Sequence, residues 1–299
     1  MININTDNKL YNYLLYILPP LLILLIYIIK YYKNKIYRYM YKKLDITPNI
    51  IHFVFGLSPH TMEFQFVHYI SILSSYEVNN PNNIYLHYRY EPHGIWWEKT
   101  KEIPNIVFKE ITNVYTHIKG RQVDNIEDIK KILEIEIIYE YGGIIIDINT
   151  ISIRPYEQFI QKKNTFLFTN NSYNSLFDSI SIAPPSSRFF KLIIDNIYNE
   201  YYKHGTKSIK GIFIDKYNKF RPLVNLVPAA ITYIPESDNH INLFTNNAQI
   251  SNELIIFNLL QNIKNKNDIY MIDSYDWIKN NPHTLYSNIV TMVLPDYII

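Results

Sequence analysis

The sequence predicts an α/β domain with a largely parallel sheet behind an N-terminal transmembrane helix. Three observations support this prediction. From Thr47 onward, short hydrophobic runs alternate with segments of helical periodicity, which is the pattern of parallel strands joined by helices. Residues 11–29 are almost wholly apolar. The segment from Tyr141 to Asn149 has the pattern of a helix end, a glycine turn and a buried strand that ends in an acid and an amide.

The apolar run from Tyr11 to Ile29 is interrupted only by Asn12 and the Pro19-Pro20 pair. Its length is close to the roughly 20 residues that a bilayer-spanning helix needs. A cleaved signal peptide would carry its positive charge before the apolar run, whereas here the basic residues follow it: Lys30, Lys33, Lys35, Arg38, Lys42 and Lys43. We therefore expect an N-terminal tail (residues 1–10), a transmembrane anchor (11–29), a basic stem (30–46) and the α/β domain (47–299).

Composition limits the possible functions. The chain has 299 residues, of which 47% are hydrophobic, and this is ample for a sizeable core. The net charge of +2 gives no signal for nucleic-acid binding, and no nucleic-acid partner is expected. Because the chain lacks cysteine, disulfides, thiolate nucleophiles and cysteine-based zinc sites are excluded.

Hydrophobic runs predict the strands of the sheet at Ile50–Phe55, Asn83–Tyr88, Ile106–Ile111, Ile144–Ile148 and Phe166–Thr169. Helical periodicity predicts helices at about Met62–Glu77, Asp124–Tyr141 and Ser187–Tyr202.

The predicted helix that ends at Tyr141 has clear boundary signals. Asp124 followed by Glu127 resembles a capping box at its start. Gly142 can take the left-handed conformation that closes a helix. Apolar residues recur at helical spacing between these ends: Ile126, Ile129, Leu133 and Ile137. The glycines after the helix therefore have a structural explanation that is independent of any site.

Three segments together resemble a known family: Ile50-Ile51-His52-Phe53-Val54-Phe55-Gly56, Glu91-Pro92-His93-Gly94-Ile95-Trp96-Trp97 and Tyr141-Gly142-Gly143-Ile144-Ile145-Ile146-Asp147. In this order and spacing they are similar to the glycosyltransferase family whose sugar-binding region contains a DXD motif. That family includes capsular polysaccharide transferases and yeast Golgi mannosyltransferases. The resemblance covers roughly Thr47 to Phe190.

The resemblance implies a nucleotide-sugar-binding, Rossmann-like domain of the GT-A type. It implies a nucleotide-sugar donor and a glycan, lipid or protein as acceptor. It also implies a divalent cation, usually Mn²⁺ with Mg²⁺ as the alternative, and transfer that retains the anomeric configuration of the sugar.

By the same resemblance, Asp147 and Asn149 are the catalytic pair and both ligate the metal, with His283 as a third ligand. A hard divalent cation held by oxygen ligands neutralises the charge of a diphosphate leaving group, and the carboxylate of Asp147 suits this task. Asn149 stands where the family has a second acid, and it would ligate through a neutral carbonyl oxygen. An Asp-x-Asn after a strand is also a common turn closed by side chain to backbone hydrogen bonds, and this alternative stays open.

Five further residues are candidates for substrate binding. The resemblance puts Phe55 against the nucleotide base, with a core phenylalanine as the alternative. His52 and Gly143 are candidates beside the donor, and a core role is the alternative for both. Lys131 and Glu134 occupy positions where the family has an Asp and an Arg that grip the donor sugar. Their spacing predicts an ion pair on one helix face.

Two interpretations of the function stay open. The first is an active, membrane-anchored hexosyltransferase-like enzyme in a Golgi or ER type of membrane. The second is a catalytically inactive binding or scaffold protein, which the departures at Lys131, Glu134 and Asn149 favour. The side of the membrane is also open, because the basic stem favours a cytosolic domain, whereas related transferases face the Golgi lumen.

Overall fold

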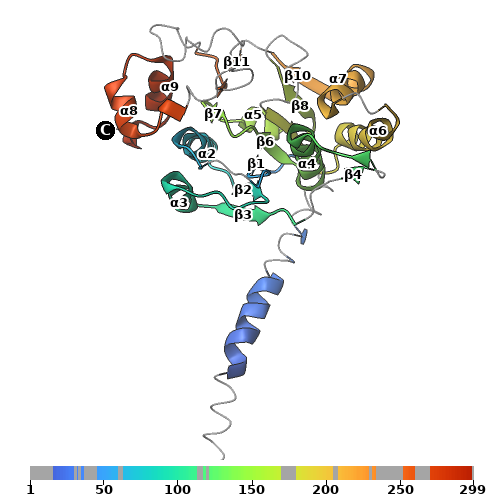
Figure 1. Ribbon diagram of the computed structural model, residues 1–299, viewed down its shortest axis with the longest axis horizontal. Helices are drawn as coiled ribbons and strands as arrows, with labels where there is room; N and C mark the ends of the chain where they lie inside the picture. The colour runs from blue at the N-terminus through green and yellow to red at the C-terminus, as the bar shows by residue number, and fades with distance from the viewer. Residues whose placement is uncertain are drawn as a thin grey trace, which may run out of the picture. The chain divides into compact units, whose positions relative to one another are not determined.

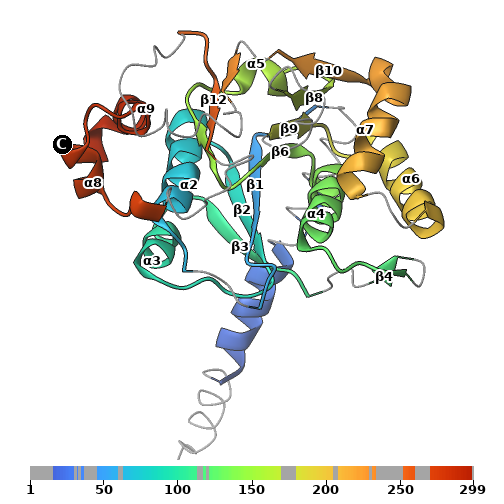
Figure 2. The same cartoon turned by 45° about the horizontal axis from the view of Figure 1, so that its top comes forward.

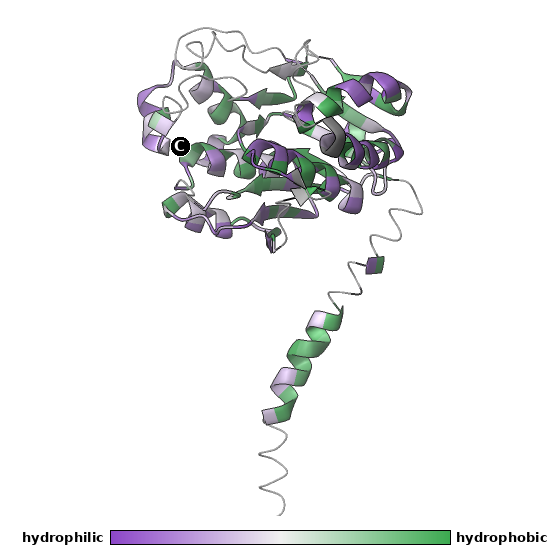
Figure 3. Cartoon of the chain, turned by 45° about the vertical axis from the view of Figure 1, so that its right-hand side comes forward, coloured by the Kyte–Doolittle hydropathy of each residue, from purple (hydrophilic) through white to green (hydrophobic). Residues whose placement is uncertain are grey.

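The computed structural model describes residues 16–29, 32, 35–36, 46–59, 63–112, 117–118, 121–169, 180–204, 208–228, 231–233, 252–259 and 270–297. The chain divides into two compact units, Met1–Leu44 and Asp45–Ile299. In the first unit residues 16–29 are helical, and most of this helix is hydrophobic (Figure 3). Its side chains are exposed. Within the described ranges, none of the helices combines the length and the apolar character needed to cross a membrane. The predicted anchor lies partly outside these ranges, at residues 11–15.

The second unit is built on a seven-stranded sheet (Figure 1). Its strands are β1 (Ile50–Phe55), β2 (Asn83–Tyr88), β3 (Ile106–Glu110), β6 (Gly143–Ile146), β8 (Thr165–Phe168), β9 (Ile180–Ala183) and β10 (Val224–Val227). They lie in the order β10-β8-β9-β6-β1-β2-β3. All neighbours are parallel except β9, which runs antiparallel to both β6 and β8. The predicted mixed α/β fold with a largely parallel sheet is therefore confirmed.

Helices cover both faces of this sheet (Figure 2). One face carries α2 (Phe66–Asn79) and α3 (Ile95–Lys101), and the other carries α4 (Ile126–Tyr141), α6 (Arg188–His204) and α7 (Ile209–Phe220). Successive side chains of a strand point to opposite faces. Accordingly Phe53 of β1 packs in the core beneath α2, while Val54 packs in the core beneath α4.

Smaller elements surround the sheet. The strands β11 (Thr232–Tyr233), β12 (Ile256–Asn258) and β7 (Thr150–Ser152) form a three-stranded sheet, and β4 (His117–Ile118) pairs with β5 (Arg121–Gln122). The remaining elements are α5 (Glu157–Ile160), η2 (Arg221–Leu223), α8 (Tyr275–Asn280), α9 (Leu285–Val293) and η6 (Pro295–Tyr297). Trp97 is buried, and Trp96 donates from Nε1 to the carbonyl of Asp273 at 3.0 Å. The hydrogen bond of Trp96 therefore joins α3 to the C-terminal segment.

The predicted bounds of β1 and β2 are confirmed, and the other predicted strands and helices are present with ends that differ from the prediction. Three of these differences are described here. The helix α2 begins at Phe66 instead of Met62. The N-cap of α4 is Asn125 instead of Asp124, because the Asn125 side chain accepts from the backbone N–H of Glu127 at 2.9 Å. The strand β6 ends at Ile146, because the chain turns there and the N–H of Thr150 donates to the carbonyl of Asp147.

The glycine pair between α4 and β6 is required by the backbone. Gly142 has φ +64° and Gly143 has φ +100°, a region that residues with a side chain rarely adopt. A Cβ on Gly142 would lie 2.5 Å from the backbone nitrogen of Pro185, and one on Gly143 would lie 2.4 Å from the carbonyl oxygen of Ile50. The pair therefore lets the end of α4 pass directly into the centre of the sheet.

Candidate functional site

The topology singles out the carboxyl ends of β1 and β6. The chain passes from β1 to β2 through α2 on one face, and it returns to β6 through α4 on the other face. Neighbouring parallel strands whose connecting helices lie on opposite faces leave a crevice at their carboxyl ends, where ligands of α/β proteins bind. Phe55 ends β1, and Asp147 directly follows β6. The sequence and the topology thus point to the same edge of the sheet.

Asp147 has hydrogen-bond partners on both carboxylate oxygens. Its Oδ2 accepts from Nζ of Lys130 at 2.7 Å. Its Oδ1 accepts from the backbone N–H of Asn149 at 3.0 Å and from the side-chain Nδ2 of Asn149 at 3.1 Å. The bond to the backbone of Asn149 is the turn that an Asp-x-Asn sequence commonly forms. The turn alternative is therefore observed, and a lysine that the sequence analysis had not selected contacts the acid.

Lys130 belongs to a chain of four charged side chains, which we call the strand-end charge cluster: Asp147, Lys130, Glu134 and Lys131. Nζ of Lys130 lies 3.8 Å from Oε1 of Glu134, and Oε2 of Glu134 accepts from Nζ of Lys131 at 2.9 Å. The predicted pair of Lys131 with Glu134 is thus present. The Glu134 side chain is only 3% exposed and the Asp147 side chain 14%. The cluster contains two acids and two lysines, so its formal charge is balanced.

Lys130 and Asp147 each shift the pKa of the other toward the charged form. Burial acts to lower the pKa of Lys130, but the carboxylates of Asp147 and Glu134 raise it further, so it lies above the ordinary value. Burial acts to raise the pKa of Asp147, but the ammonium of Lys130 outweighs this and holds it below the ordinary value of 3.8. Both groups therefore stay charged at neutral pH.

Aromatic side chains border the cluster. Burial lowers the pKa of His68 on α2 to about 4, while the charge of Asp147 acts in the opposite direction. Burial and the charge of Asp147 both raise the pKa of Tyr270. Phe55 packs against the rings of Phe64 and His68, with centroid distances of 5.0 Å and 4.9 Å. Phe55 is only partly buried, so its contact with a nucleotide base stays a prediction.

His52 lies in the core, and its contact with the donor stays a prediction. Its side chain has no exposed surface, and burial lowers its pKa to about 3. Nε2 lies 3.0 Å from the carbonyl oxygen of Gly142, which can only accept, so Nε2 carries the proton. Nδ1 then accepts from Nε2 of His87 at 3.1 Å. Gly143 is likewise buried, and the packing beneath Ile50 explains it without a ligand.

His283 lies in the turn between α8 and α9 and is exposed. None of the hydrogen bonds or ion pairs found in the described ranges joins it to Asp147. Its role as a metal ligand stays a prediction from the resemblance.

The residues around Asp147 do not fit a divalent cation. Such an ion requires carboxylate oxygens that are open to it, whereas Oδ2 of Asp147 is bound by an ammonium. The Oδ1 atom of Asn149 is buried and has no hydrogen-bond partner in the described part of the chain, but it is a single neutral oxygen. Among the described residues, no group of three or more His, Cys, Asp or Glu side chains could hold a metal ion.

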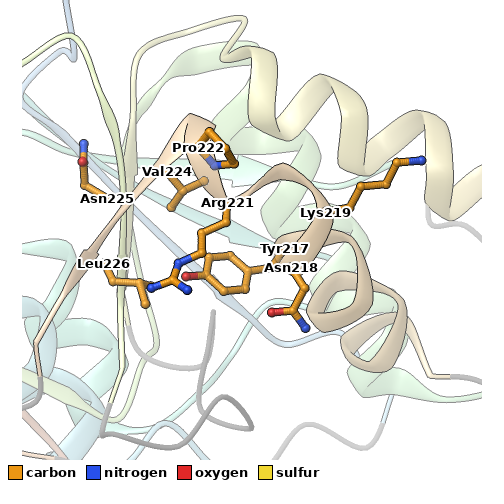
Figure 4. A pocket seen from close by; sticks show the side chains of 8 residues that line it. All are labelled: Tyr217, Asn218, Lys219, Arg221, Pro222, Val224, Asn225 and Leu226. Carbon is orange, nitrogen blue, oxygen red and sulfur yellow. The ribbon is translucent and has the colours of Figure 1, made fainter.

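A separate surface hollow of about 760 Å³ lies where α7, η2 and β10 meet (Figure 4). Its lining residues are Tyr217, Asn218, Lys219, Arg221, Pro222, Val224, Asn225 and Leu226. Lys219 points away from the other side chains of the hollow in Figure 4. The strand-end charge cluster contributes nothing to this lining, so the hollow is distinct from the candidate site.

No protein-family model matches the chain. Over 129 residues the chain is 26% identical to glucan organizing enzyme 1 of Cryptococcus neoformans var. grubii serotype A. The matched segment covers 42% of this chain and 34% of the relative. The chain therefore spans about a third of the length of this curated relative.

Similar solved structures are glycosyltransferases. PaToxG glycosyltransferase is 12% identical, with a TM-score of 0.43, and the match covers 64% of this chain and 80% of that chain. The glycosyltransferase GlyE of Streptococcus pneumoniae TIGR4 is 10% identical, with a TM-score of 0.45 and coverage of 84% and 64%. The galactosyltransferase LgtC in complex with donor and acceptor sugar analogs is 9% identical, with a TM-score of 0.43 and coverage of 82% and 95%. With TM-scores below 0.5, these structures are only loosely similar to this chain in their overall fold.

Proposed function

We propose that the unit Asp45–Ile299 is a glycosyltransferase domain of the GT-A type, which binds a nucleotide-sugar donor at the carboxyl ends of β1 and β6. The observation that carries the proposal is the position of Asp147. This acid follows the central strand β6, at the crevice between strands whose helices cover opposite faces. Ligand-binding groups of α/β proteins concentrate at this point.

The sequence supports the sugar chemistry of the proposal. The three segments that resemble the DXD-containing glycosyltransferase family include β1, the start of α3 and the passage from α4 to β6. Two of them therefore lead to the proposed crevice. The relative named glucan organizing enzyme 1 is consistent with a carbohydrate substrate. We accordingly propose a nucleotide-sugar as donor and a glycan as the first acceptor to test, with lipid and protein acceptors as alternatives.

Several finer features are proposals from the sequence alone. Retention of the anomeric configuration and a hexosyl donor come from the resemblance. A single-pass anchor at residues 11–29 comes from their apolar character, and a Golgi or ER type of membrane comes from the resemblance. Manganese is also expected from the resemblance, but the charge balance around Asp147 argues against it.

The proposal is tested by calorimetric titration of the full-length chain, purified in detergent, with UDP and with GDP. Each titration is made with Mn²⁺ and with EDTA. Hydrolysis of UDP-sugars and GDP-sugars is then measured for the nucleotide that binds. We expect one of the two nucleotides to bind, and Asp147→Asn to weaken its binding on the order of tenfold, because the Asp147 carboxylate holds Nζ of Lys130 in place at the end of β6.

The matched control is Asp195→Asn, which removes an exposed acid paired with Lys191 on α6. This variant should bind the nucleotide as the wild type does. A folded protein that binds neither UDP nor GDP under either condition would contradict the proposed function.

A second candidate function is a catalytically inactive binding or scaffold module. The ion pair of Lys130 with Asp147 favours it, because this pair leaves no open carboxylate at the end of β6. Nucleotide binding without hydrolysis of any sugar nucleotide would support this alternative over an active transferase.

A further inference from the structure

The ammonium of Lys130 lies where a divalent cation would need to bind at the end of β6. Nζ donates to Oδ2 of Asp147 at 2.7 Å and lies 3.8 Å from Oε1 of Glu134. It is therefore a cation flanked by two carboxylates, which is the environment that a metal ion would otherwise have. The side chain of Lys130 is 18% exposed, so the lysine is mostly buried but not sealed off from the surface.

This lysine cannot share Asp147 with a divalent ion at low cost. A metal ion bound to Oδ2 would displace the ammonium from its hydrogen bond and would lie close to a positive charge in a partly buried site. Charges at such a separation interact strongly where water is scarce. Lys131 adds a second positive charge next to Glu134. The cluster is already neutral without a metal ion.

We propose that Lys130 is a built-in replacement for the divalent cation, so that this site binds the diphosphate of a nucleotide without a metal ion. The proposal rests on the proposed function, since it names the group that meets the donor at that site. A lysine ammonium has three N–H donors, and the bond to Asp147 uses one of them. Lysine binds phosphate as a point charge in other nucleotide sites. The ligand class is a nucleoside diphosphate or its sugar ester.

Two titrations of the full-length protein in detergent test this proposal. In the first, UDP and GDP are titrated in EDTA and in Mn²⁺. We expect the Kd of the nucleotide that binds to agree within about twofold between the two conditions. In the second, Mn²⁺ alone is titrated, and we expect no binding to the wild type.

Two substitutions identify the group responsible. Lys130→Met should weaken nucleotide binding in EDTA on the order of tenfold or more, and Lys130→Arg should retain metal-independent binding because it keeps the charge. Lys191→Met removes an exposed lysine paired with Asp195, and it is the matched control without an expected effect. Near-ultraviolet circular dichroism shows whether each variant is folded.

Three results would overturn the proposal: nucleotide binding only in the presence of Mn²⁺, binding of Mn²⁺ alone that Asp147→Asn removes, or full nucleotide affinity in folded Lys130→Met. The first leaves the proposed function intact, because the nucleotide still binds. If neither nucleotide binds under any condition, the proposed function and this inference both fail. The titrations thus distinguish the failure of the inference from the failure of the function.

Discussion

Nζ of Lys130 donates to Oδ2 of Asp147 at 2.7 Å, and this contact joins the first half of α4 to the end of β6 across 17 positions of sequence. The antiparallel course of α4 relative to the parallel strands makes the contact possible, because the start of the helix returns to the edge where the strands end. The same geometry brings Glu134 and Lys131 to this edge. Lys130 therefore links Asp147 to Glu134 within the strand-end charge cluster.

Loss of Lys130 should destabilise the fold. The substitution Lys130→Met leaves Asp147 without its cation, while Glu134 keeps its ion pair with Lys131. Removal of one partner from a buried ion pair costs about 3–5 kcal/mol, and the partial exposure of this pair places the expected loss at about 3 kcal/mol or less. Urea unfolding measures the free energy of unfolding. A loss no greater than that of the exposed control Lys191→Met would show that the pair adds no stability.

The same pair should make stability depend on pH in the acid range. The pKa of Asp147 is lower in the folded protein than its ordinary value of 3.8, so its charged form stabilises the fold. This contribution is present above the unfolded pKa of about 3.9 and is lost as the pH falls through the folded pKa. The pKa of Lys130 is raised instead, so its contribution is lost only in strongly alkaline solution.

We therefore expect the difference in the free energy of unfolding between wild type and Asp147→Asn to be constant from about pH 5 to pH 8. It should shrink as the pH falls below about 4, because protonated Asp147 then resembles asparagine in charge. Urea unfolding at a series of pH values measures this difference. A difference that stays constant down to pH 2 would contradict the coupling.

Gly143 should not tolerate a side chain. In Gly143→Ala the new Cβ would lie 2.4 Å from the carbonyl oxygen of Ile50, at a φ of +100°. Strain of this kind costs about 1–3 kcal/mol, and the backbone shift in the central sheet adds to it. Gly211→Ala is the matched control in α7, where the nearest atom to a Cβ is Oγ of Ser208 at 3.5 Å. This control should gain about 0.5–1 kcal/mol, since alanine favours a helix over glycine.

Thermal unfolding of both glycine variants measures the contrast. We expect a lower Tm or a loss of folded protein for Gly143→Ala and an unchanged or higher Tm for Gly211→Ala. Equal Tm values for Gly143→Ala and the wild type would show that the turn between α4 and β6 can relax.

The sequence predicts local features of this fold better than contacts between distant segments. The bounds of β1 and β2 follow from largely hydrophobic runs, and the pair of Lys131 with Glu134 follows from helical spacing. The contact of Lys130 with Asp147 depends on how α4 is rotated about its axis against the sheet. One local signal was available, because Lys130 lies four positions before Glu134 and hence on the same helix face.

The contact of His52 with His87 is a second example of a long-range contact that the local sequence does not predict. These residues lie 35 positions apart, and their contact depends on the register of β1 with β2. His52 is opposite Tyr85, so His87 lies two residues further along β2 and points to the same face. Neither strand alone contains the information that the two rings meet.

This histidine pair should make the protein sensitive to mild acid. Burial lowers the pKa of His52 to about 3, from an ordinary value of 6.5. Between these two values the unfolded chain binds a proton that the folded protein does not, so stability falls as the pH falls below about 6.5. Full protonation of one such group in the unfolded state changes the free energy of unfolding by about 1.4 kcal/mol per pH unit.

In His52→Gln, whose amide can still donate to the carbonyl of Gly142, the decline in the free energy of unfolding between pH 6.5 and pH 4.5 should be shallower than in the wild type. Urea unfolding at each pH measures the slope, and His283→Gln, at an exposed position, is the control that should keep the slope of the wild type. Equal slopes in His52→Gln and the wild type would show that His52 does not remain neutral in the core.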